Sequence, residues 1–127
     1  TNRHVDVVCW HQGESDGLIE TNPNYYSDSL KQVIFQYRNQ LFCNITTPFI
    51  VGETTGGFIE TDKGWEARNN ELRYLNKDSD AYTKCVNSQD LKTSDTEHPD
   101  GDKIHFSADA QRKLGTLYFK AFRSIFK

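Results

Sequence analysis

Short apolar runs recur along the chain, and each is followed by polar or turn-forming residues. The run VDVVCW at 5–10 is rich in β-branched residues and leads into the polar, glycine-containing sequence HQGESDG. A second run, FIV at 49–51, lies between Pro48 and Gly52, and a weaker run, KCVN, occupies 84–87. Continuous apolar runs of this length, bounded by turn residues, are typical of buried parallel strands. We therefore predict strands near 5–10, 49–52 and 84–87.

The segments outside these runs repeat apolar residues at helical spacing. The pattern predicts an amphipathic helix over 24–42, after the turn-like sequence NPN, and a weaker helix over 65–75. The last segment gives the clearest pattern, because Ser107 can cap a helix and Asp109 lies in its first turn, where a carboxylate is favourable. Its predicted apolar stripe comprises Ala110, Leu114, Leu117, Tyr118, Ala121, Phe122 and Ile125.

Strands that alternate with helices indicate an α/β fold built from βαβ units, with a mainly parallel sheet between helices. A length of 127 residues fits one domain. The segment 88–102, rich in Asp, Ser and Thr, is predicted to be a long surface loop. Loops that follow strands are where open α/β sheets build their active sites.

Charge and hydropathy narrow the class of partner. Lys and Arg total 15 against 18 for Asp and Glu, so a net charge of -3 provides no cationic surface for nucleic acid or anionic lipid. No apolar run approaches the ~20 residues of a membrane helix, and the N-terminal sequence lacks the layout of a signal peptide. We expect a soluble chain without a membrane span. Its location stays open, secreted and extracellular sites included, and the sequence NIT at 44–46 is a glycosylation acceptor only in a eukaryotic secretory pathway.

The cysteines Cys9, Cys43 and Cys85 are too few and too widely spaced for a CxxC zinc pair or a disulfide framework. We expect them to be small buried apolar residues. One disulfide plus one free thiol remains an open alternative.

A polar segment at 10–17, WHQGESDG, directly follows the first predicted strand, so its side chains emerge at the carboxyl end of the sheet. Taken literally, Gly13-x-Ser15-x-Gly17 matches the nucleophile elbow of α/β-hydrolases, a strained turn between a strand and a helix. That fold needs more strands on both sides of the elbow than are predicted here, and no helix-forming run begins at Asp16. Ser15 is thus an alternative nucleophile that we expect to be structural.

A second polar segment, DKIHFS at 102–107, lies immediately before the last predicted helix. In such a loop a carboxylate can accept a hydrogen bond from the imidazole Nδ1, fix the tautomer and stabilise the imidazolium formed when Nε2 takes a proton. Asp102 would then orient the ring and His105 would be the general base. An isolated DxxH more often reflects a helix-capping histidine and a solvated aspartate, so this spacing alone is weak evidence for catalysis.

Together the two segments resemble the sialate O-acetylesterase and acetylxylan esterase-like branch of the SGNH (GDSL) hydrolases. The resemblance rests on WxQGESD after a strand, on DxxHFS far downstream of it, and on Gln111 and Leu114-Gly115 in the closing helix. The strand PFIVGE at 48–53 also looks like the family's middle strand. The resemblance implies a three-layer, flavodoxin-like SGNH fold and hydrolysis of acetyl esters on carbohydrates by a serine nucleophile, without a metal or organic cofactor.

Site roles follow from this resemblance. His105 looks like the family's general base and Asp102 like its orienting acid. Oxyanion and substrate-binding roles are implied for Gln12, Gly13 and Glu14, with the Gln12 amide directed at the oxyanion. Glu14, like Asp16, can also hold the loop by hydrogen bonds or be a surface carboxylate.

One departure from the family is large. The family's nucleophile lies in a GxSN-like segment upstream of WxQGESD, and no such segment occurs in this sequence. The strands present would be the third, fourth and fifth of the family's sheet, so residues 1–127 are expected to be the C-terminal portion of one esterase domain. The expected partners are an acetylated carbohydrate and a second chain or N-terminal segment that carries the serine and the first strands. The alternative is a non-catalytic carbohydrate-binding or attachment module on the esterase scaffold.

Other polar and aromatic residues have simpler interpretations. His98 could bind a metal together with Asp95, Asp100 and Asp102, but the spacing matches no defined site, and we expect a solvated loop. His4 and His11 are likewise not expected to be ligands. Trp65, with the GGF sequence at 56–58, could stack on a sugar ring, yet its place on a helical stripe favours the core.

Overall fold

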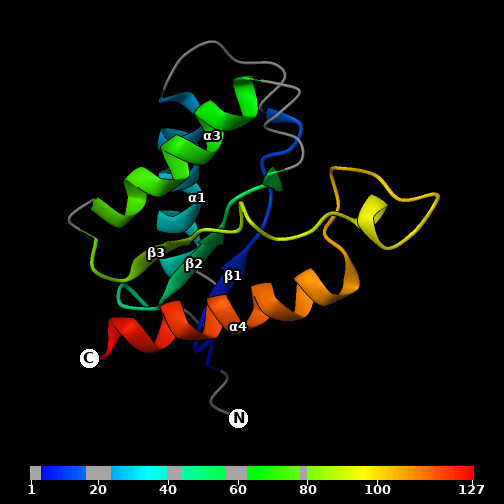
Figure 1. The fold of residues 1–127 in the computed structure, drawn as a ribbon. Coiled ribbons are helices and arrows are strands. Elements are labelled where there is room, and N and C mark those ends of the chain that lie inside the picture. The colour runs from blue at the N-terminus through cyan, green and yellow to red at the C-terminus, as the bar shows by residue number, and fades with distance from the viewer. Residues whose placement is uncertain (1–3, 17–23, 40–43, 57–62, 78–79) are drawn as a thin grey trace.

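The structure, a computed structural model, describes residues 4–16, 24–39, 44–56, 63–77 and 80–127 (Figure 1). The elements in chain order are β1 (Val8–Trp10), α1 (Tyr25–Asn39), β2 (Phe49–Gly52), α3 (Lys63–Tyr74), β3 (Thr83–Val86) and α4 (Ala108–Ile125). Short 3₁₀ turns cover Leu75–Lys77 and Ser94–Thr96. Residues 40–42 of the first predicted helix, as well as Gly17 and Cys43, lie outside the described ranges.

The three strands form one parallel sheet in the order β1-β2-β3, so the predicted α/β class with a parallel sheet is confirmed. Val8 pairs with Phe49, and Phe49 pairs in turn with Thr83. β1 is shorter than the predicted 5–10, because its pairing begins where the Val8 N–H donates to the Pro48 carbonyl at 2.9 Å, just before β2 starts. β3 begins at Thr83, one residue earlier than predicted.

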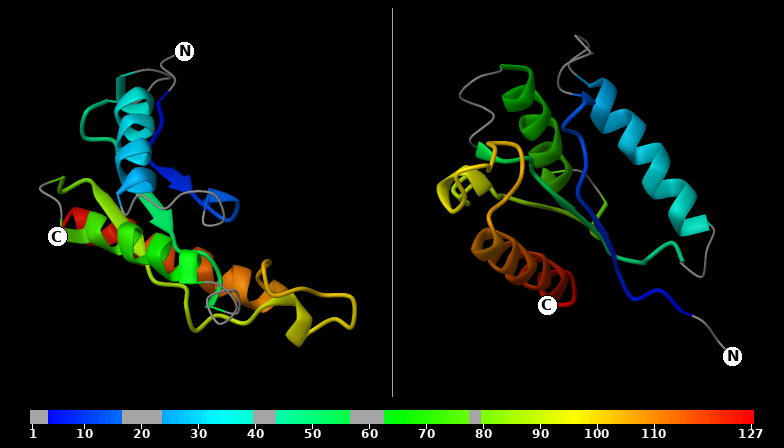
Figure 2. Two further views of the ribbon diagram at one scale, coloured as in Figure 1. Left: turned by 90° about the horizontal axis from the view of Figure 1, so that it is seen from above. Right: turned by 90° about the vertical axis from the view of Figure 1, so that its right-hand side faces the viewer.

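Helices cover both faces of the sheet, which makes three layers: α1 and α3 lie on one face and α4 on the other (Figure 2). Connections between neighbouring parallel strands are normally right-handed crossovers. When each new parallel strand is added on the same side of the previous one, such crossovers place successive helices on the same face of the sheet. The core between α1, α3 and the sheet contains Tyr26, Leu30, Ile34, Phe49, Val51, Leu72, Leu75 and Cys85. Trp65 on α3 is only 1% exposed, which confirms that it belongs to the core.

The final helix forms as its sequence predicts. Ser107 is the N-cap, and its side-chain oxygen accepts a hydrogen bond from the Ala110 N–H at 3.2 Å. The predicted stripe packs against Ile50, Val86 and Phe106 through Ala110, Leu114, Leu117, Tyr118, Ala121, Phe122 and Ile125. Within the described ranges, no helix is both long enough and apolar enough to cross a bilayer.

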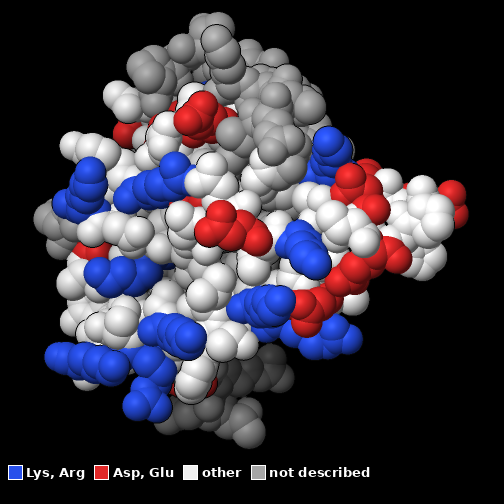
Figure 3. Space-filling view, viewed as in Figure 1, with Lys and Arg blue, Asp and Glu red and all other residues white. Residues whose placement is uncertain are grey.

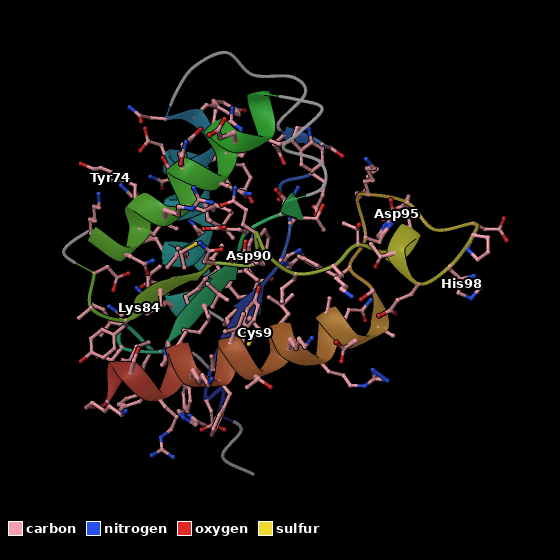
Figure 4. The ribbon with its side chains drawn as sticks, in the orientation of Figure 1. Cys9, Tyr74, Lys84, Asp90, Asp95 and His98 are labelled. Carbon is pink, nitrogen blue, oxygen red and sulfur yellow. The ribbon has the colours of Figure 1, made fainter. Side chains whose placement is uncertain are left out.

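The two outer edges of the sheet differ. On β3, the Asn76 side chain pairs with the backbone of Cys85, accepting from its N–H at 2.8 Å and donating to its carbonyl at 3.1 Å. Cys85 is buried as expected, and burial raises the pKa of its thiol to about 12. Cys9 on β1 is exposed, so the expectation that it is buried was wrong. It lies beside α4 (Figure 4), in a groove along the open edge of β1.

Gly52, at the carboxyl end of β2, allows α4 to approach the sheet. A Cβ atom at this position would lie 2.3 Å from Tyr118 Oη and 2.6 Å from His11 Nδ1. We expect Gly52→Ala to lower the free energy of unfolding by about 1–3 kcal/mol, the usual cost of overpacking. Urea denaturation of the purified protein measures this change.

Gly115 on α4 is the matched control, because a Cβ atom there meets nothing within 4 Å. Gly115→Ala should raise the free energy of unfolding by up to about 1 kcal/mol, since alanine is the better helix former. Equal stability of the two variants would contradict the close approach at Gly52.

Candidate active site

The segment 88–107 leaves β3 and projects beyond the carboxyl end of the sheet as a long loop (Figure 1), as predicted for 88–102. The loop folds back on itself through an isolated antiparallel bridge between Thr93 and Phe106. Next to this bridge, the Ser94 N–H donates to the His105 carbonyl at 2.8 Å, and the Ser107 N–H donates to the Lys92 carbonyl at 3.0 Å. The second half of the loop therefore contains Asp102 and His105 and leads directly to Ser107, the N-cap of α4.

Asp102 and His105 form a hydrogen-bonded pair. His105 Nδ1 lies 2.8 Å from Asp102 Oδ2, while Asp102 Oδ1 accepts from the backbone N–H groups of His105 at 2.7 Å and Ile104 at 2.8 Å. The backbone N–H of His105, and then its imidazole, lower the pKa of the Asp102 carboxyl. An ionised carboxylate only accepts hydrogen bonds, so Nδ1 carries the ring proton and Nε2 is the basic nitrogen. The His105 side chain is 72% exposed, which leaves the ring open to a reaction partner.

Gln12 follows β1 and is held from α1. The Tyr26 hydroxyl donates to the Gln12 carbonyl at 2.5 Å and lies 3.1 Å from the side-chain Oε1. Gln12 Nε2 donates to Asp16 Oδ2 at 2.7 Å. An amide nitrogen carries two N–H donors, and this bond to Asp16 uses one of them. Burial raises the pKa of Tyr26 to about 12, so its hydroxyl remains a donor at neutral pH.

The next two residues, Gly13 and Glu14, shape the turn after Gln12. Gly13 has φ 137°, a left-handed conformation that favours glycine, and a Cβ atom there would lie 3.1 Å from the Tyr26 ring. Glu14 Oε1 lies 3.5 Å from His11 Nε2, and this hydrogen bond is the main cause that lowers the pKa of the Glu14 carboxyl. Glu14 and Asp16 thus both contact side chains of their own loop.

His11 joins the two polar segments. Its ring packs edge-on against Phe106 with ring centroids 5.4 Å apart, and its Nδ1 lies 3.4 Å from Tyr118 Oη. Tyr118 in turn donates to the Trp10 carbonyl at 2.6 Å. WHQGESD and DKIHFS therefore meet beside the carboxyl end of β1, through residues adjacent to Gln12 and His105. Sequence reasoning gave Tyr26 and Tyr118 no place in the site, because their rings pack in the apolar core and only the fold gives their hydroxyls these partners.

Ser15 is exposed in the turn after β1. No hydrogen bond joins its hydroxyl to the His105 ring, although both residues are described. The residues that follow this turn, 17–23, lie outside the described ranges.

The remaining histidines and carboxylates do not gather at one point. His98 lies near the tip of the projecting loop (Figure 4), while Asp95 accepts a hydrogen bond from the Thr93 hydroxyl. His4 lies 3.3 Å from Asp6, and both side chains are exposed. Among the described residues, no three His, Cys, Asp or Glu side chains are close enough together to hold a metal ion.

Charge is distributed unevenly around the loop. Figure 3 shows Asp and Glu side chains clustered over the projecting loop, and Lys and Arg side chains spread over the rest of this face, including α4.

Comparison with known proteins places the chain in a family. A family model described as carbohydrate esterase, sialic acid-specific acetylesterase, matches residues 1–124, a range that includes both polar segments. Neither curated proteins nor solved structures gave a significant match. The family match supports carbohydrate esterase activity and agrees with the resemblance drawn from WxQGESD and DxxHFS. The chain belongs to the sialic acid-specific acetylesterase family of carbohydrate esterases.

Proposed function

We propose that this chain supplies the histidine base, its orienting aspartate and part of the oxyanion site of an SGNH-type serine esterase. The substrate is an O-acetylated carbohydrate of the sialate or xylan type, and the products are acetate and the free sugar hydroxyl. The observation that carries the proposal is the hydrogen bond of 2.8 Å between Asp102 Oδ2 and His105 Nδ1. Because this hydrogen bond uses Nδ1, the other ring nitrogen of His105, Nε2, is left for the serine hydroxyl.

The proposed reaction has two stages. His105 Nε2 takes the proton of a serine hydroxyl while the serine oxygen bonds to the acetyl carbonyl carbon. The tetrahedral intermediate then collapses, the bond from carbon to the sugar oxygen breaks, and the imidazolium returns the proton to that oxygen. Water attacks the acetyl-serine in the same manner, releases acetate and restores the serine. Asp102 keeps Nδ1 protonated throughout and stabilises the imidazolium.

The carbonyl oxygen becomes negative in both stages and needs hydrogen-bond donors. We propose that Gln12 donates an amide N–H to it, with help from the backbone at Gly13, while Glu14 steadies the loop through His11. A donor placed where charge develops is worth about 2.7–4 kcal/mol in the transition state. The Tyr26 hydroxyl supports this role, because its contacts with the carbonyl and side-chain oxygens of Gln12 fix the loop before substrate binds.

The serine is proposed to come from a GxSN-bearing segment, upstream in the same chain or on another chain, that adds a strand to β1. Because the Val8 N–H points to β2, the alternating geometry of a strand directs the Cys9 N–H toward the outer edge. A groove of about 540 Å³ lies along this edge, between β1 and α4. Its lining is mostly apolar and includes Val7, Cys9, Leu114, Tyr118 and Phe122, which suits a strand with apolar side chains.

The test measures acetate release from an O-acetylated sialic acid and p-nitrophenol release from p-nitrophenyl acetate. Residues 1–127 alone should be nearly inactive on both substrates. Activity should appear when the GxSN-bearing segment is supplied in the same chain or as a partner. A fluorophosphonate probe, mapped by mass spectrometry, should then label the serine of that segment.

Two results would contradict the proposal in different ways. A fluorophosphonate adduct on Ser15 would make the turn after β1 the nucleophile site. Tight binding of the acetylated sugar without acetate release, in the presence of the GxSN-bearing segment, would instead indicate a binding module on the esterase scaffold.

A further inference from the structure

The four residues 102–105 are held in place by side chains and backbone from distant parts of the chain. Asp102 and His105 bond to each other, but their relative position also depends on the backbone between them. The backbone φ and ψ angles between Asp102 and His105 set the distance between the two side chains. Small rotations about any of these bonds would move the ring away from the carboxylate. External contacts to both ends of the segment would remove this freedom.

Ser94 makes contacts at both ends. Its hydroxyl accepts from the Asp102 N–H at 2.9 Å and donates to the Asp102 carbonyl at 3.0 Å. Its own backbone N–H donates to the His105 carbonyl at 2.8 Å. One residue thus bonds to the backbone of the proposed orienting acid and of the proposed base.

Two further residues surround this contact. Thr55, 1% exposed just beyond β2, donates its hydroxyl to the Lys103 carbonyl at 2.6 Å and so fixes the middle of the segment to the sheet. Gly101 packs directly on the backbone of Ser94, where a Cβ atom would lie 2.3 Å from the Ser94 carbonyl carbon. The approach of Ser94 to Asp102 therefore depends on glycine at position 101.

We propose that Ser94 is a positioning residue that sets the geometry of the Asp102–His105 pair by holding both ends of the segment 102–105. This inference rests on the proposed function, in which His105 is the base. Ser94 touches neither the substrate nor the reacting atoms, and it acts only through the backbone of Asp102 and His105.

The other carboxylates of the loop do not replace Asp102 in this arrangement. Asp95 accepts from the Thr93 hydroxyl, and Glu97 accepts from the Ala108 N–H at 3.1 Å. Without the Ser94 hydroxyl, the Asp102 N–H loses its acceptor and the Asp102 carbonyl keeps only the Asp95 N–H at 3.1 Å, and no other acceptor is brought to His105 Nδ1. The expected consequence is a mixture of ring orientations and tautomers, because the Nδ1–H form is fixed by its carboxylate partner.

The first experiment uses the 127-residue protein and records ¹⁵N–¹H spectra of the His105 ring at about pH 8.5, where imidazole rings are generally neutral. The native ring should be in the Nδ1–H form. Ser94→Ala should convert it to a mixture of tautomers, whereas Ser94→Thr, which keeps the hydroxyl, should preserve the native signature. Thr96→Val is the matched control, because it removes a hydroxyl bond to the Thr93 carbonyl in the same loop without touching 102–105.

Amide spectra of α4 and the sheet show whether Ser94→Ala is folded. If it is not, Ser94→Cys, nearly isosteric but a weaker hydrogen-bond group, replaces it in the same comparison. A native ring signature in the folded hydroxyl-deficient variant, the same as in Thr96→Val, overturns the inference whatever the activity.

The second experiment measures kinetics in the protein that includes the GxSN-bearing segment. Ser94→Ala should lower kcat about 10- to 100-fold with little change in KM, because a slightly misplaced base affects the transition state more than substrate binding. Ser94→Thr should recover most of this loss. If the assembled protein shows no esterase activity but the ring signature depends on Ser94, the proposed function fails and the positioning stands. A full kcat in Ser94→Ala overturns the positioning alone.

Discussion

Replacing His105 with alanine should lower kcat for acetyl-ester hydrolysis by about 10⁴-fold or more, once the chain acts together with a serine-bearing segment. Without the imidazole, no group accepts the serine proton or returns it to the sugar oxygen. The members of such a triad act as a unit, so most of the activity disappears with any one of them. Steady-state release of acetate, measured with purified and folded variants, gives the ratio of kcat values.

Asp102→Asn should cost about as much, near 10⁴-fold, although it barely changes the shape of the side chain. An asparagine amide can donate to Nδ1, which would place the ring proton on Nε2 and remove the base. His98→Ala is the control, because His98 is an exposed histidine of the same loop whose side chain makes no hydrogen bond to Asp102 or His105. If His105→Ala hydrolysed acetyl esters with an unchanged kcat, DKIHFS would have no role in catalysis. That result would favour the hypothesis of a carbohydrate-binding module.

The elements of the fold could be predicted where local chemistry determines them. The stripe from Ala110 to Ile125 needs no distant contact to be recognised, and Ser107 caps α4 as its hydroxyl and position indicate. The strands around Cys9, Ile50 and Cys85 were also correctly located, since strands of a parallel sheet tend to have a continuous apolar sequence, although Cys9 itself is exposed. Strand ends were less accurate, because they depend on where the neighbouring strand begins.

The site could be predicted only in part. DxxH suggests that Asp102 and His105 can meet, because three residues in a loop span a short distance. The contacts of Tyr26, Thr55 and Ser94 join residues far apart in the sequence, and no local pattern encodes them. Cys9 is a similar case: its apolar sequence context predicts burial, but its exposure depends on what covers the outer edge of β1.

A buried ion pair near the site could not be predicted either. Glu53, directly after β2, is 0% exposed, and its carboxylate accepts two hydrogen bonds from the Arg73 guanidinium on α3, at 2.6 and 3.1 Å. The backbone carbonyl of Glu53 accepts from the Ser88 hydroxyl at 2.7 Å, at the start of the loop that leads to Asp102. The hydrogen bonds that Arg73 donates to Glu53 also raise the pKa of Arg73. This pair therefore links the sheet, α3 and the base of the loop 88–107.

Arg73→Ala should lower the free energy of unfolding by about 3 kcal/mol, because it leaves the Glu53 carboxylate buried without its cation. The lower end of the usual range applies, since Arg73 is about one third exposed and water can partly replace the guanidinium. Urea denaturation followed by circular dichroism measures the change. Adding Glu53→Gln to Arg73→Ala should recover part of the loss, because a neutral amide is less costly to bury than an unpaired charge.

Lys113→Ala is the control for this experiment, because its ion pair with Asp109 at 2.6 Å lies on the exposed surface of α4 and should contribute little to stability. A loss from Arg73→Ala no larger than that from Lys113→Ala would mean that the Glu53 carboxylate does not depend on Arg73. If Glu53→Gln with Arg73→Ala were less stable than Arg73→Ala alone, the carboxylate would be stabilised by groups other than Arg73. Either result would contradict the conclusion that the Glu53–Arg73 ion pair stabilises the packing of α3 on β2. It would also leave the buried charge at the end of the central strand without a stabilising role.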